Sequence, residues 1–364
     1  MSCSVSHVPC SNFMKAVFFR RHGGNEVLEY GDWPDPEPGP GEVVVGIRAA
    51  ALNHLDIFAR NGIPDVPLPQ VPGADGAGIV EEVGEGVAGL SVGDRVLVQP
   101  GLFCGVCEFC LGGEQSLCVK YGILGEHAPG TFAEKALVPA RNLFPIPDTL
   151  SFEQAAAFPL SYQTAWRLIV TRGAVRPGST VLIHGVGGGV GWAALEIALL
   201  CSARVIATTS GEEKASAARG AGAELVVDYT KEDVEKAIRQ HTAKRGVDVV
   251  VDSVGEKTWM TSLRTVRRGG RIVTCGATSG PNPPEEIRLI FWKHLSILGS
   301  TMANDREFRA LLQTVAAGRL SPRIDRVLPL AQAPEAYRLL EEGRQFGKIV
   351  LVPDGQARNW PDGD

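Results

Sequence analysis

The stretch VLIHGVGGGVGWAALEIALL, residues 181–200, decides how this chain folds. It begins with a short apolar run, passes through a cluster of glycines and ends in an apolar segment of helical length. Gly188 lets the backbone approach a pyrophosphate group, and Gly191 lets a helix pack closely on the preceding strand. The helix N-terminus then offers free N–H groups and a positive dipole to the phosphates. We expect this turn to bind a dinucleotide through Gly187, Gly188, Gly189, Val190 and Gly191.

Strands and helices alternate on both sides of this turn. Apolar runs of strand length recur at 180–185, 204–209, 224–228, 247–255, 270–276 and 295–300. Segments of helical character separate them, including one predicted over 230–241, and Ser151 is a candidate N-cap of a helix before the first run. Continuous apolar runs are typical of parallel strands that are buried on both faces. The alternation predicts an α/β fold with a doubly wound, six-stranded parallel sheet.

The rest of the chain has a different character. Residues 14–160 consist of short β-like runs separated by glycine and proline, which predicts a β-rich part. The dinucleotide-binding part is expected over 161–301, and the segment 302–364 is expected to return and complete the first part. Residues 1–13 are expected to be a disordered extension, or upstream sequence read from an early start codon.

Composition narrows the function further. The chain has 364 residues and a formal net charge of −5. It has no basic stripe of the kind that binds nucleic acid and no apolar stretch of the roughly 18 residues that span a membrane. The N-terminus lacks the features of a signal peptide. We expect a cytoplasmic protein with reduced thiols whose partner is a small molecule.

Four of the eight cysteines are clustered in the stretch CGVCEFCLGGEQSLC, residues 104–118. Four thiolates close a tetrahedral shell and leave no open position for water or substrate. Cys104, Cys107, Cys110 and Cys118 therefore predict one structural zinc site, which iron could also occupy. The remaining cysteines are scattered and are interpreted as tail or small core residues.

The strand at 204–209 bears on the choice of cofactor. Proteins that bind NAD usually place an acidic residue at the end of this strand, to hold the ribose hydroxyls. This chain has Thr208, Thr209 and Ser210 there, followed by Lys214. Hydroxyls and a lysine can bind a 2′-phosphate, whereas an acid would repel it. The sequence therefore favours NADP(H) over NAD(H).

Together these motifs resemble the medium-chain dehydrogenase/reductase superfamily, from Met14 to Pro353. The supporting stretches are PGADGAGIVEEVG, VGDRV, the cysteine cluster, GGGVG, DSVG, GGRIVTCG and GKIVL. The resemblance implies a GroES-like catalytic domain, a Rossmann domain, an active site in the cleft between them and hydride transfer with NAD(P)H. It also implies a homodimer or homotetramer, often joined through the last Rossmann strand. Gly276 and Lys348 complete the predicted cofactor-binding residues, since Lys348 corresponds to a family position near the pyrophosphate.

The same resemblance bears on the catalytic metal. Zinc-dependent relatives have ligands at the positions of Asn53, Ala74 and Leu160, and none of these ligands is kept here. The Asn53 segment and the PGADGAG pattern are similar to the quinone oxidoreductase branch, which works without a catalytic metal. A different metal site built from His54, Asp56 and Asp75 is the alternative.

These observations predict an NADPH-dependent reductase of quinones or α,β-unsaturated carbonyls. The candidate catalytic residues are Asn53, His54 and Tyr162, with Gln163 as a further hydrogen-bond donor. A zinc-type alcohol or aldehyde dehydrogenase with a rearranged metal site is one alternative. The other is a protein that binds NADPH without catalysis, as a sensor or scaffold.

Overall fold

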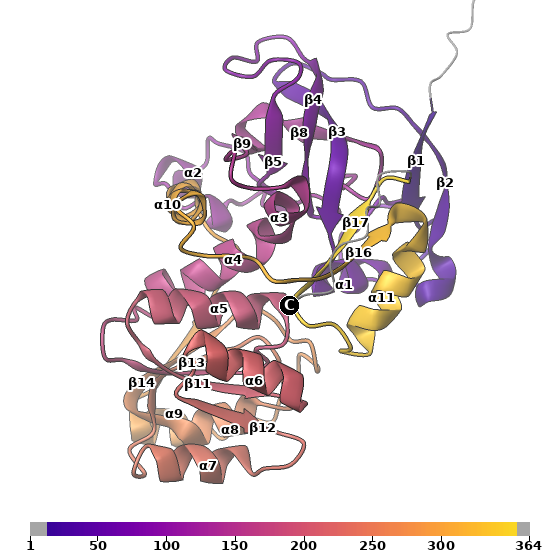
Figure 1. The fold of residues 1–364 in the computed structure, drawn as a ribbon. Coiled ribbons are helices and arrows are strands. Elements are labelled where there is room, and N and C mark those ends of the chain that lie inside the picture. Colours follow the sequence, from indigo (N-terminus) through magenta and orange to yellow (C-terminus); the bar gives the residue numbers. More distant parts are fainter. Residues whose placement is uncertain (1–12, 355–364) are drawn as a thin grey trace, which may run out of the picture.

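The computed structural model describes residues 13–354, which fold into two parts joined along one side (Figure 1). The upper part in Figure 1 is rich in strands, and the lower part is a sheet covered by helices. The predicted N-terminal extension lies outside the described residues, except for Phe13, which opens the first strand. None of the helices in residues 13–354 is long and apolar enough to cross a membrane.

The lower part contains a six-stranded parallel sheet with the strand order β12–β11–β10–β13–β14–β15. Its strands are β10 (Thr180–Ile183), β11 (Arg204–Thr209), β12 (Leu225–Asp228), β13 (Val247–Asp252), β14 (Val266–Thr274) and β15 (Ser296–Gly299). Every residue of β10 is buried, as expected for a central strand covered on both faces. This confirms the predicted doubly wound fold.

Helices connect these strands and cover the sheet (Figure 1). They are α5 (Gly189–Leu200), α6 (Glu212–Ala221), α7 (Val234–His241), α8 (Trp259–Thr265) and α9 (Ile287–Lys293). The helix predicted over 230–241 begins later, at Val234. Asp228 binds the backbone N–H and the hydroxyl of Thr230, which holds that segment in a turn, and Asp233 caps the helix.

The upper part is built on a seven-stranded sheet. Its path is β16–β17–β3–β4–β5–β9, and β8 pairs with β3. These strands are β3 (Glu42–Ala51), β4 (Asp75–Val83), β5 (Arg95–Val98), β8 (Lys135–Pro139), β9 (Leu143–Pro145), β16 (Ile324–Pro329) and β17 (Lys348–Val352). Since β17 pairs with β3, the C-terminal segment returns to complete this sheet. Two short pairs accompany it, β1 (Phe13–Phe18) with β2 (Glu29–Pro34) and β6 (Gly101–Leu102) with β7 (Gly122–Ile123).

The remaining α-helices of the described residues lie outside the parallel sheet and its connections. They are α1 (His54–Asn61), α2 (Glu108–Leu111), α3 (Phe152–Ala157), α4 (Pro159–Trp166), α10 (Asp305–Ala316) and α11 (Ala333–Glu341). Ser151 caps α3 as predicted, and its hydroxyl accepts the Gln154 N–H. Proline at position 159 separates α3 from α4, because it lacks an N–H and fits the first turn of a new helix.

The glycine turn and the return segment meet where the two parts join. The N–H of Gly347 donates to the carbonyl oxygen of Gly187 at 3.0 Å. The aliphatic chain of Lys348, the first residue of β17, lies against the same turn, because a Cβ at Gly189 would come within 2.9 Å of it. The start of β17 is thus fixed between the glycine turn and the upper sheet.

Candidate active site and cysteine lobe

The clustered cysteines lie on one loop around the short helix α2, which we call the cysteine lobe (residues 104–118). The four sulfur atoms all lie within 4.8 Å of one another, and no other group of His, Cys, Asp or Glu within residues 13–354 is gathered in this way. The N–H groups of Val106 and Cys107 point at the sulfur of Cys104, at 3.5 and 3.4 Å. Such bonds favour a metal-binding thiolate. The donor set fits one tetrahedral zinc ion.

The cysteine lobe is tied to α4 through charged side chains. Arg167, which follows α4 directly and is buried, pairs with Glu114 of the lobe at 2.5 Å and with buried Glu307 at 2.7 Å. The Asn304 amide donates to the other oxygen of Glu114 at 3.3 Å. The lobe therefore braces one end of α4, whose other end carries Leu160.

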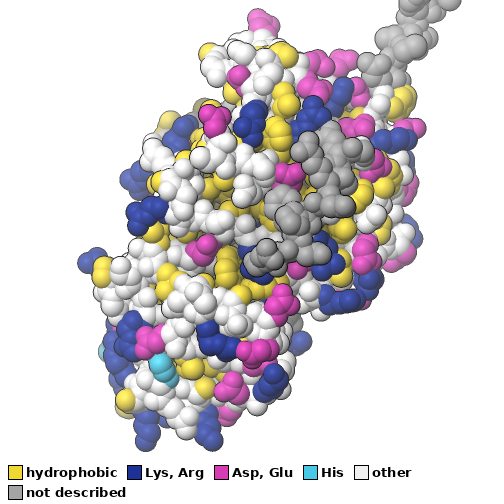
Figure 2. Space-filling model, in the orientation of Figure 1, with side chains coloured by type: hydrophobic (Ala, Val, Ile, Leu, Met, Phe, Trp, Pro, Cys, Tyr) yellow, Lys and Arg dark blue, Asp and Glu magenta, His cyan; other side chains and the backbone are white. Residues whose placement is uncertain are grey.

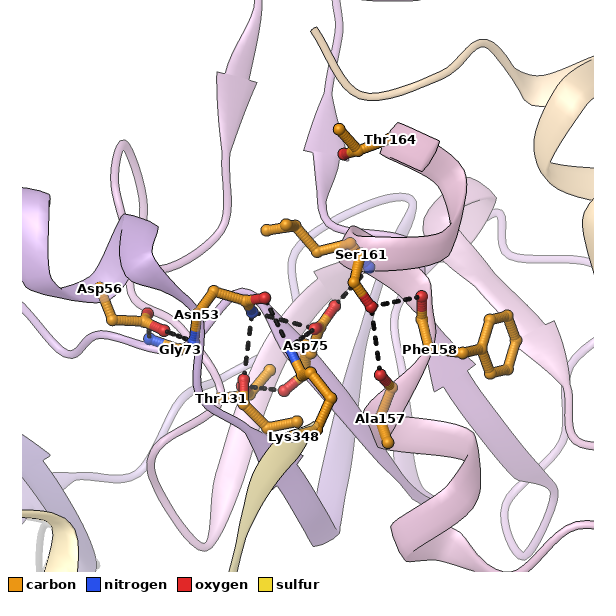
Figure 3. Close-up of polar contacts among 12 residues, drawn as sticks. Asn53, Asp56, Gly73, Asp75, Thr131, Ala157, Phe158, Ser161, Thr164 and Lys348 are labelled. Atoms are coloured by element: carbon orange, nitrogen blue, oxygen red, sulfur yellow. Dashed lines mark hydrogen bonds and ion pairs between the residues drawn. The ribbon is translucent and has the colours of Figure 1, made fainter. Parts of the chain in front are cut away.

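Asn53, which the resemblance places at a catalytic zinc ligand position, is part of a hydrogen-bonded polar arrangement with Asp75 and Lys348 (Figure 3). Asn53 caps α1, and its amide nitrogen donates to the Asp75 carboxylate at 2.9 Å. Its amide oxygen accepts a hydrogen bond from the ammonium group of Lys348. That ammonium also pairs with Asp75 at 3.1 Å. We call these three residues the Asn53–Asp75–Lys348 cluster.

The residues of this cluster are buried and satisfy one another's charges and hydrogen bonds. Asp75 is 0% exposed and Lys348 is 4% exposed. The second carboxylate oxygen of Asp75 accepts the N–H of Leu160 at 2.8 Å, so both oxygens are engaged. The cluster therefore carries its own cation and leaves neither Asn53 nor Asp75 free to bind a metal.

The other two ligand positions are apolar. Ala74 and Leu160 are buried together with Ile123 and Met302, and Leu55 and Tyr121 pack against this group. Neither the Ala74 nor the Leu160 side chain has an atom that can ligate a metal. These residues form a buried apolar group beside the Asn53–Asp75–Lys348 cluster, and we call this group the cleft floor.

His54 and Asp56 do not lie in a group of possible metal ligands within residues 13–354. Burial and the charge of Lys348 lower the pKa of His54 to about 4, which keeps its imidazole neutral near pH 7. Asp56 accepts the backbone N–H groups of Asn53 and Gly73, at 2.7 and 2.9 Å, and burial raises its pKa to about 7. Asp56 therefore has a structural role, as a cap of α1 and a brace for the Gly73 turn.

The hydroxyl of Tyr162 is already bonded within the chain. Tyr162 is 1% exposed, and its hydroxyl contacts the Glu196 carboxyl and, at 3.0 Å, the carbonyl oxygen of Ser321. Burial raises the pKa of Glu196 to about 7. Of the polar residues predicted from the sequence to act on substrate, Asn53 is held in the cluster and Tyr162 joins three segments of the chain. Gln163 keeps an amide nitrogen that is buried and has no hydrogen-bond partner among residues 13–354.

Tyr121 was not found by sequence reasoning. It packs against Ala74 and Leu160, and its hydroxyl is buried without a hydrogen-bond partner in the part of the chain that the structure describes. Burial raises its pKa, so the phenol stays protonated. A buried donor that no protein group satisfies is a candidate to bind a ligand. Only its position directly after the cysteine cluster could have pointed to it.

The glycine turn has the features that the sequence predicts. A Cβ at Gly191 would lie 2.2 Å from the carbonyl oxygen of Gly185, so only glycine lets α5 pack this closely. Nothing comes nearer than 3.8 Å to a Cβ at Gly188, which leaves the backbone open on that side. An open turn at a helix N-terminus fits a dinucleotide pyrophosphate.

The residues predicted to distinguish NADP(H) from NAD(H) lie at the end of β11 and in the helix that follows it. Thr208 accepts the N–H of Gly185 at 3.2 Å and is committed to the turn itself. Thr209 is buried and Ser210 is half-buried at the end of the strand. The ammonium of Lys214 donates to the carbonyl oxygen of Gly343 at 2.8 Å, and its side chain lies against Gly187. Gly276 follows β14 beside Ser253.

Comparisons with known proteins agree with this architecture. Residues 39–148 match the model of the alcohol dehydrogenase GroES-like domain, and residues 189–317 match that of the zinc-binding dehydrogenases. An acryloyl-coenzyme A reductase from Metallosphaera sedula is 34% identical, covering 93% of this chain and 100% of its own. A quinone oxidoreductase from Pseudomonas aeruginosa is also 34% identical, covering 93% and 99%. A crystal structure of an NAD-dependent alcohol dehydrogenase is 49% identical, with a TM-score of 0.89 and coverage of 93% and 99%.

A GroES-like sheet completed by the return segment, together with a Rossmann sheet, defines an NAD(P)H-dependent oxidoreductase. The chain belongs to the medium-chain dehydrogenase/reductase superfamily.

Proposed function

We propose that this protein is an NADPH-dependent reductase that transfers hydride to a quinone or an α,β-unsaturated carbonyl, without zinc in the cleft. One observation carries the proposal. The positions of the catalytic zinc ligands hold Asn53, Ala74 and Leu160, and Asn53 is engaged by the Lys348 ammonium.

The chemistry of such acceptors suits this cleft. When hydride reaches the β-carbon of an enone, or a quinone ring, the negative charge spreads onto an oxygen, and hydrogen-bond donors suffice to stabilise it. The buried hydroxyl of Tyr121 and the amide nitrogen of Gln163 are the proposed donors, since neither has a partner within the described residues. His54 stays neutral and is the proposed relay for the proton that completes the reduction.

The cofactor supplies the hydride when it is bound, and the glycine turn is proposed to hold its pyrophosphate. Thr209, Ser210 and Lys214 are proposed to bind the 2′-phosphate of NADP(H), because β11 ends without an acid. The relative named as NAD-dependent favours the opposite preference. Lys214→Met separates the two, because it should raise the KM for NADPH about tenfold and leave that for NADH unchanged.

Two alternatives remain open to test. Relatives named as alcohol dehydrogenases favour a zinc-type alcohol or aldehyde dehydrogenase with a rearranged metal site. This alternative requires a second metal site in addition to the cysteine lobe. A protein that binds NADPH without turnover is the other alternative.

We also propose a cytoplasmic homodimer, with a homotetramer as the larger alternative. The edge of β15 has no strand partner on its outer side among the described residues. Beside it, Ile287, Phe291 and Trp292 of α9 are each more than 60% exposed. An open strand edge and an apolar helix face are suited to pair with a second copy.

Steady-state kinetics test the proposed activity. Purified protein should oxidise NADPH with a small quinone or an enone, and this rate should survive a chelator that spares the cysteine lobe. Turnover of alcohols with NAD⁺ that needs a second metal would support the dehydrogenase reading. NADPH binding without turnover of any quinone, enone or enal would support the non-catalytic reading.

A further inference from the structure

A basic pocket lies at the end of the Rossmann sheet that is remote from the glycine turn. It has a volume of about 600 Å³, and seven of its eleven lining residues are arginine or lysine while one is glutamate. The lining comes from the ends of α7 and α8, the start of β14 and one side of α9. Lys and Arg side chains are visible around the lower edge of the molecule in Figure 2. This concentration is unexpected in a chain whose net charge is −5.

The pocket is separate from the cofactor site. Dinucleotides bind at the carboxyl ends of parallel strands, where the turn after β10 lies. The pocket instead includes Gly246 and Val266, which lie at the amino ends of β13 and β14. It also faces away from Ile287 and Phe291 of α9. Leu289 and Lys293 line the pocket, while Ile287 and Phe291 lie on the other side of a helix with 3.6 residues per turn.

Nearby acids do not neutralise these cations. Glu235 pairs with both Arg239 and Arg264, at 3.1 and 3.5 Å. Asp248 pairs with both Arg245 and Arg267, at 2.7 and 2.5 Å. Each of these carboxylates is thus shared by two guanidinium groups, which leaves excess positive charge.

The remaining cations add to this excess. Lys244 has no side-chain hydrogen bond or ion pair within residues 13–354, and Arg268 binds only the carbonyl oxygen of Trp292 and packs on its ring. Lys293 donates to three carbonyl oxygens at 2.9 Å and forms a fixed charge in the wall. Burial, together with Arg239 and Arg268, lowers the pKa of Lys293, as expected where like charges gather.

The geometry points to a binding site for a small polyphosphate, meaning an anion with two or more linked phosphoryl groups. Guanidinium groups bind phosphate oxygens in pairs, and several converge here from different elements. A neighbouring hollow of about 700 Å³ shares Glu235, Arg239 and Lys244 and adds Lys236 and one acid, Asp233; its volume gives room for more than one phosphoryl group. Neither lining contains an aromatic residue on which a base could stack, which favours a small polyphosphate over single-stranded nucleic acid.

Binding of inorganic tripolyphosphate tests this inference. Titration calorimetry at low salt should detect one site per chain, with affinity that falls steeply as salt rises. Saturating NADPH should not displace the anion, because the glycine turn is elsewhere. Arg239→Gln/Arg264→Gln should weaken binding at least about tenfold, since two charge-assisted contacts are lost. Both side chains are more than half exposed, so the fold should survive, as unfolding without ligand will check.

The matched control is Arg20→Gln/Arg338→Gln, which removes the same charge from exposed arginines elsewhere. It should bind tripolyphosphate as the unaltered protein does. Equal affinity in the pocket variant and the control variant would overturn the inference. Displacement of the anion by NADPH would also overturn it, by assigning binding to the glycine turn. Tighter binding of a twelve-nucleotide single strand than of tripolyphosphate would assign the surface to nucleic acid instead.

Discussion

The cysteine lobe and the Asn53–Asp75–Lys348 cluster are both compact polar groups, but their charges are arranged in opposite ways. The lobe brings four cysteine sulfur atoms together, and their thiolate forms need a metal ion to balance the gathered negative charge. The cluster already contains an ammonium beside its carboxylate. The contrast supports the proposal that a side-chain cation stands in the cleft where zinc-dependent relatives hold a metal, whereas the lobe has a donor set suited to a metal ion.

The largest expected effect is on the lobe. Cys107→Ser removes one thiolate ligand, so the zinc content should fall from about one per chain to near zero. The free energy of unfolding should fall by about 5 kcal/mol or more, because metal binding contributes to folding directly. Elemental analysis and urea unfolding measure the two quantities. Cys201→Ser, which changes a cysteine outside the lobe, is the control and should change neither.

The cluster should respond to loss of its own cation. Lys348→Met leaves the Asp75 carboxylate buried and unpaired, at an expected cost of about 3–5 kcal/mol in urea unfolding. Lys348→Met/Asp75→Asn should recover much of this stability, because no buried charge remains. Lys15→Met breaks an exposed pair with Asp32 and should cost less than about 1 kcal/mol. A loss of zinc in Lys348→Met would contradict the separation of the two regions.

A smaller effect is expected at the cleft floor. Tyr121→Phe removes a hydroxyl that no group within residues 13–354 satisfies, so its stability should be unchanged or slightly higher. If that hydroxyl binds the substrate oxygen, kcat with a quinone or enone should fall about tenfold to a hundredfold. Tyr229→Phe, on the surface, should retain full activity. An unaltered rate in Tyr121→Phe would remove this residue from the mechanism.

The smallest effect concerns pH. The pKa of His54 is lowered to about 4 from its ordinary 6.5, so the unfolded chain binds more protons than the folded one between these values. Stability from this group is therefore complete above pH 6.5 and is lost as the pH falls toward 4. Relative to His54→Gln, the unaltered protein should lose about 1–2 kcal/mol between pH 7 and pH 5. A parallel pH dependence in both proteins would show that His54 is solvated instead.

Much of the fold follows from local sequence. The glycine turn, the six apolar strands and the Ser151 cap each depend on a few residues that are adjacent in the sequence, and the structure confirms all three. The start of a helix is predicted less accurately where nearby side chains form hydrogen bonds with the backbone and hold it in a turn. Asp228 and Thr230 form a turn that postpones α7 to Val234, although the segment from 230 has helical composition.

The candidate site was predictable only in part, for a physical reason. Missing metal ligands can be read from single positions such as Ala74 and Leu160. The ion pair between Lys348 and Asp75 joins residues 273 positions apart, and they meet because β3 pairs with β17 on one side and with β4 on the other. Tyr121 could not be predicted from the local sequence, because whether its hydroxyl has a hydrogen-bond partner depends on residues that only the fold brings around it.

The most direct test of the central claim is the zinc content of the purified protein, measured together with its quinone or enone reductase activity. We predict about one zinc per chain, held by the cysteine lobe, with NADPH turnover that does not depend on any further metal. About two zinc ions per chain, with activity that disappears when the second is removed, would contradict the account. The cleft would then hold a catalytic metal, and His54 and Asp75 would be the first residues to change.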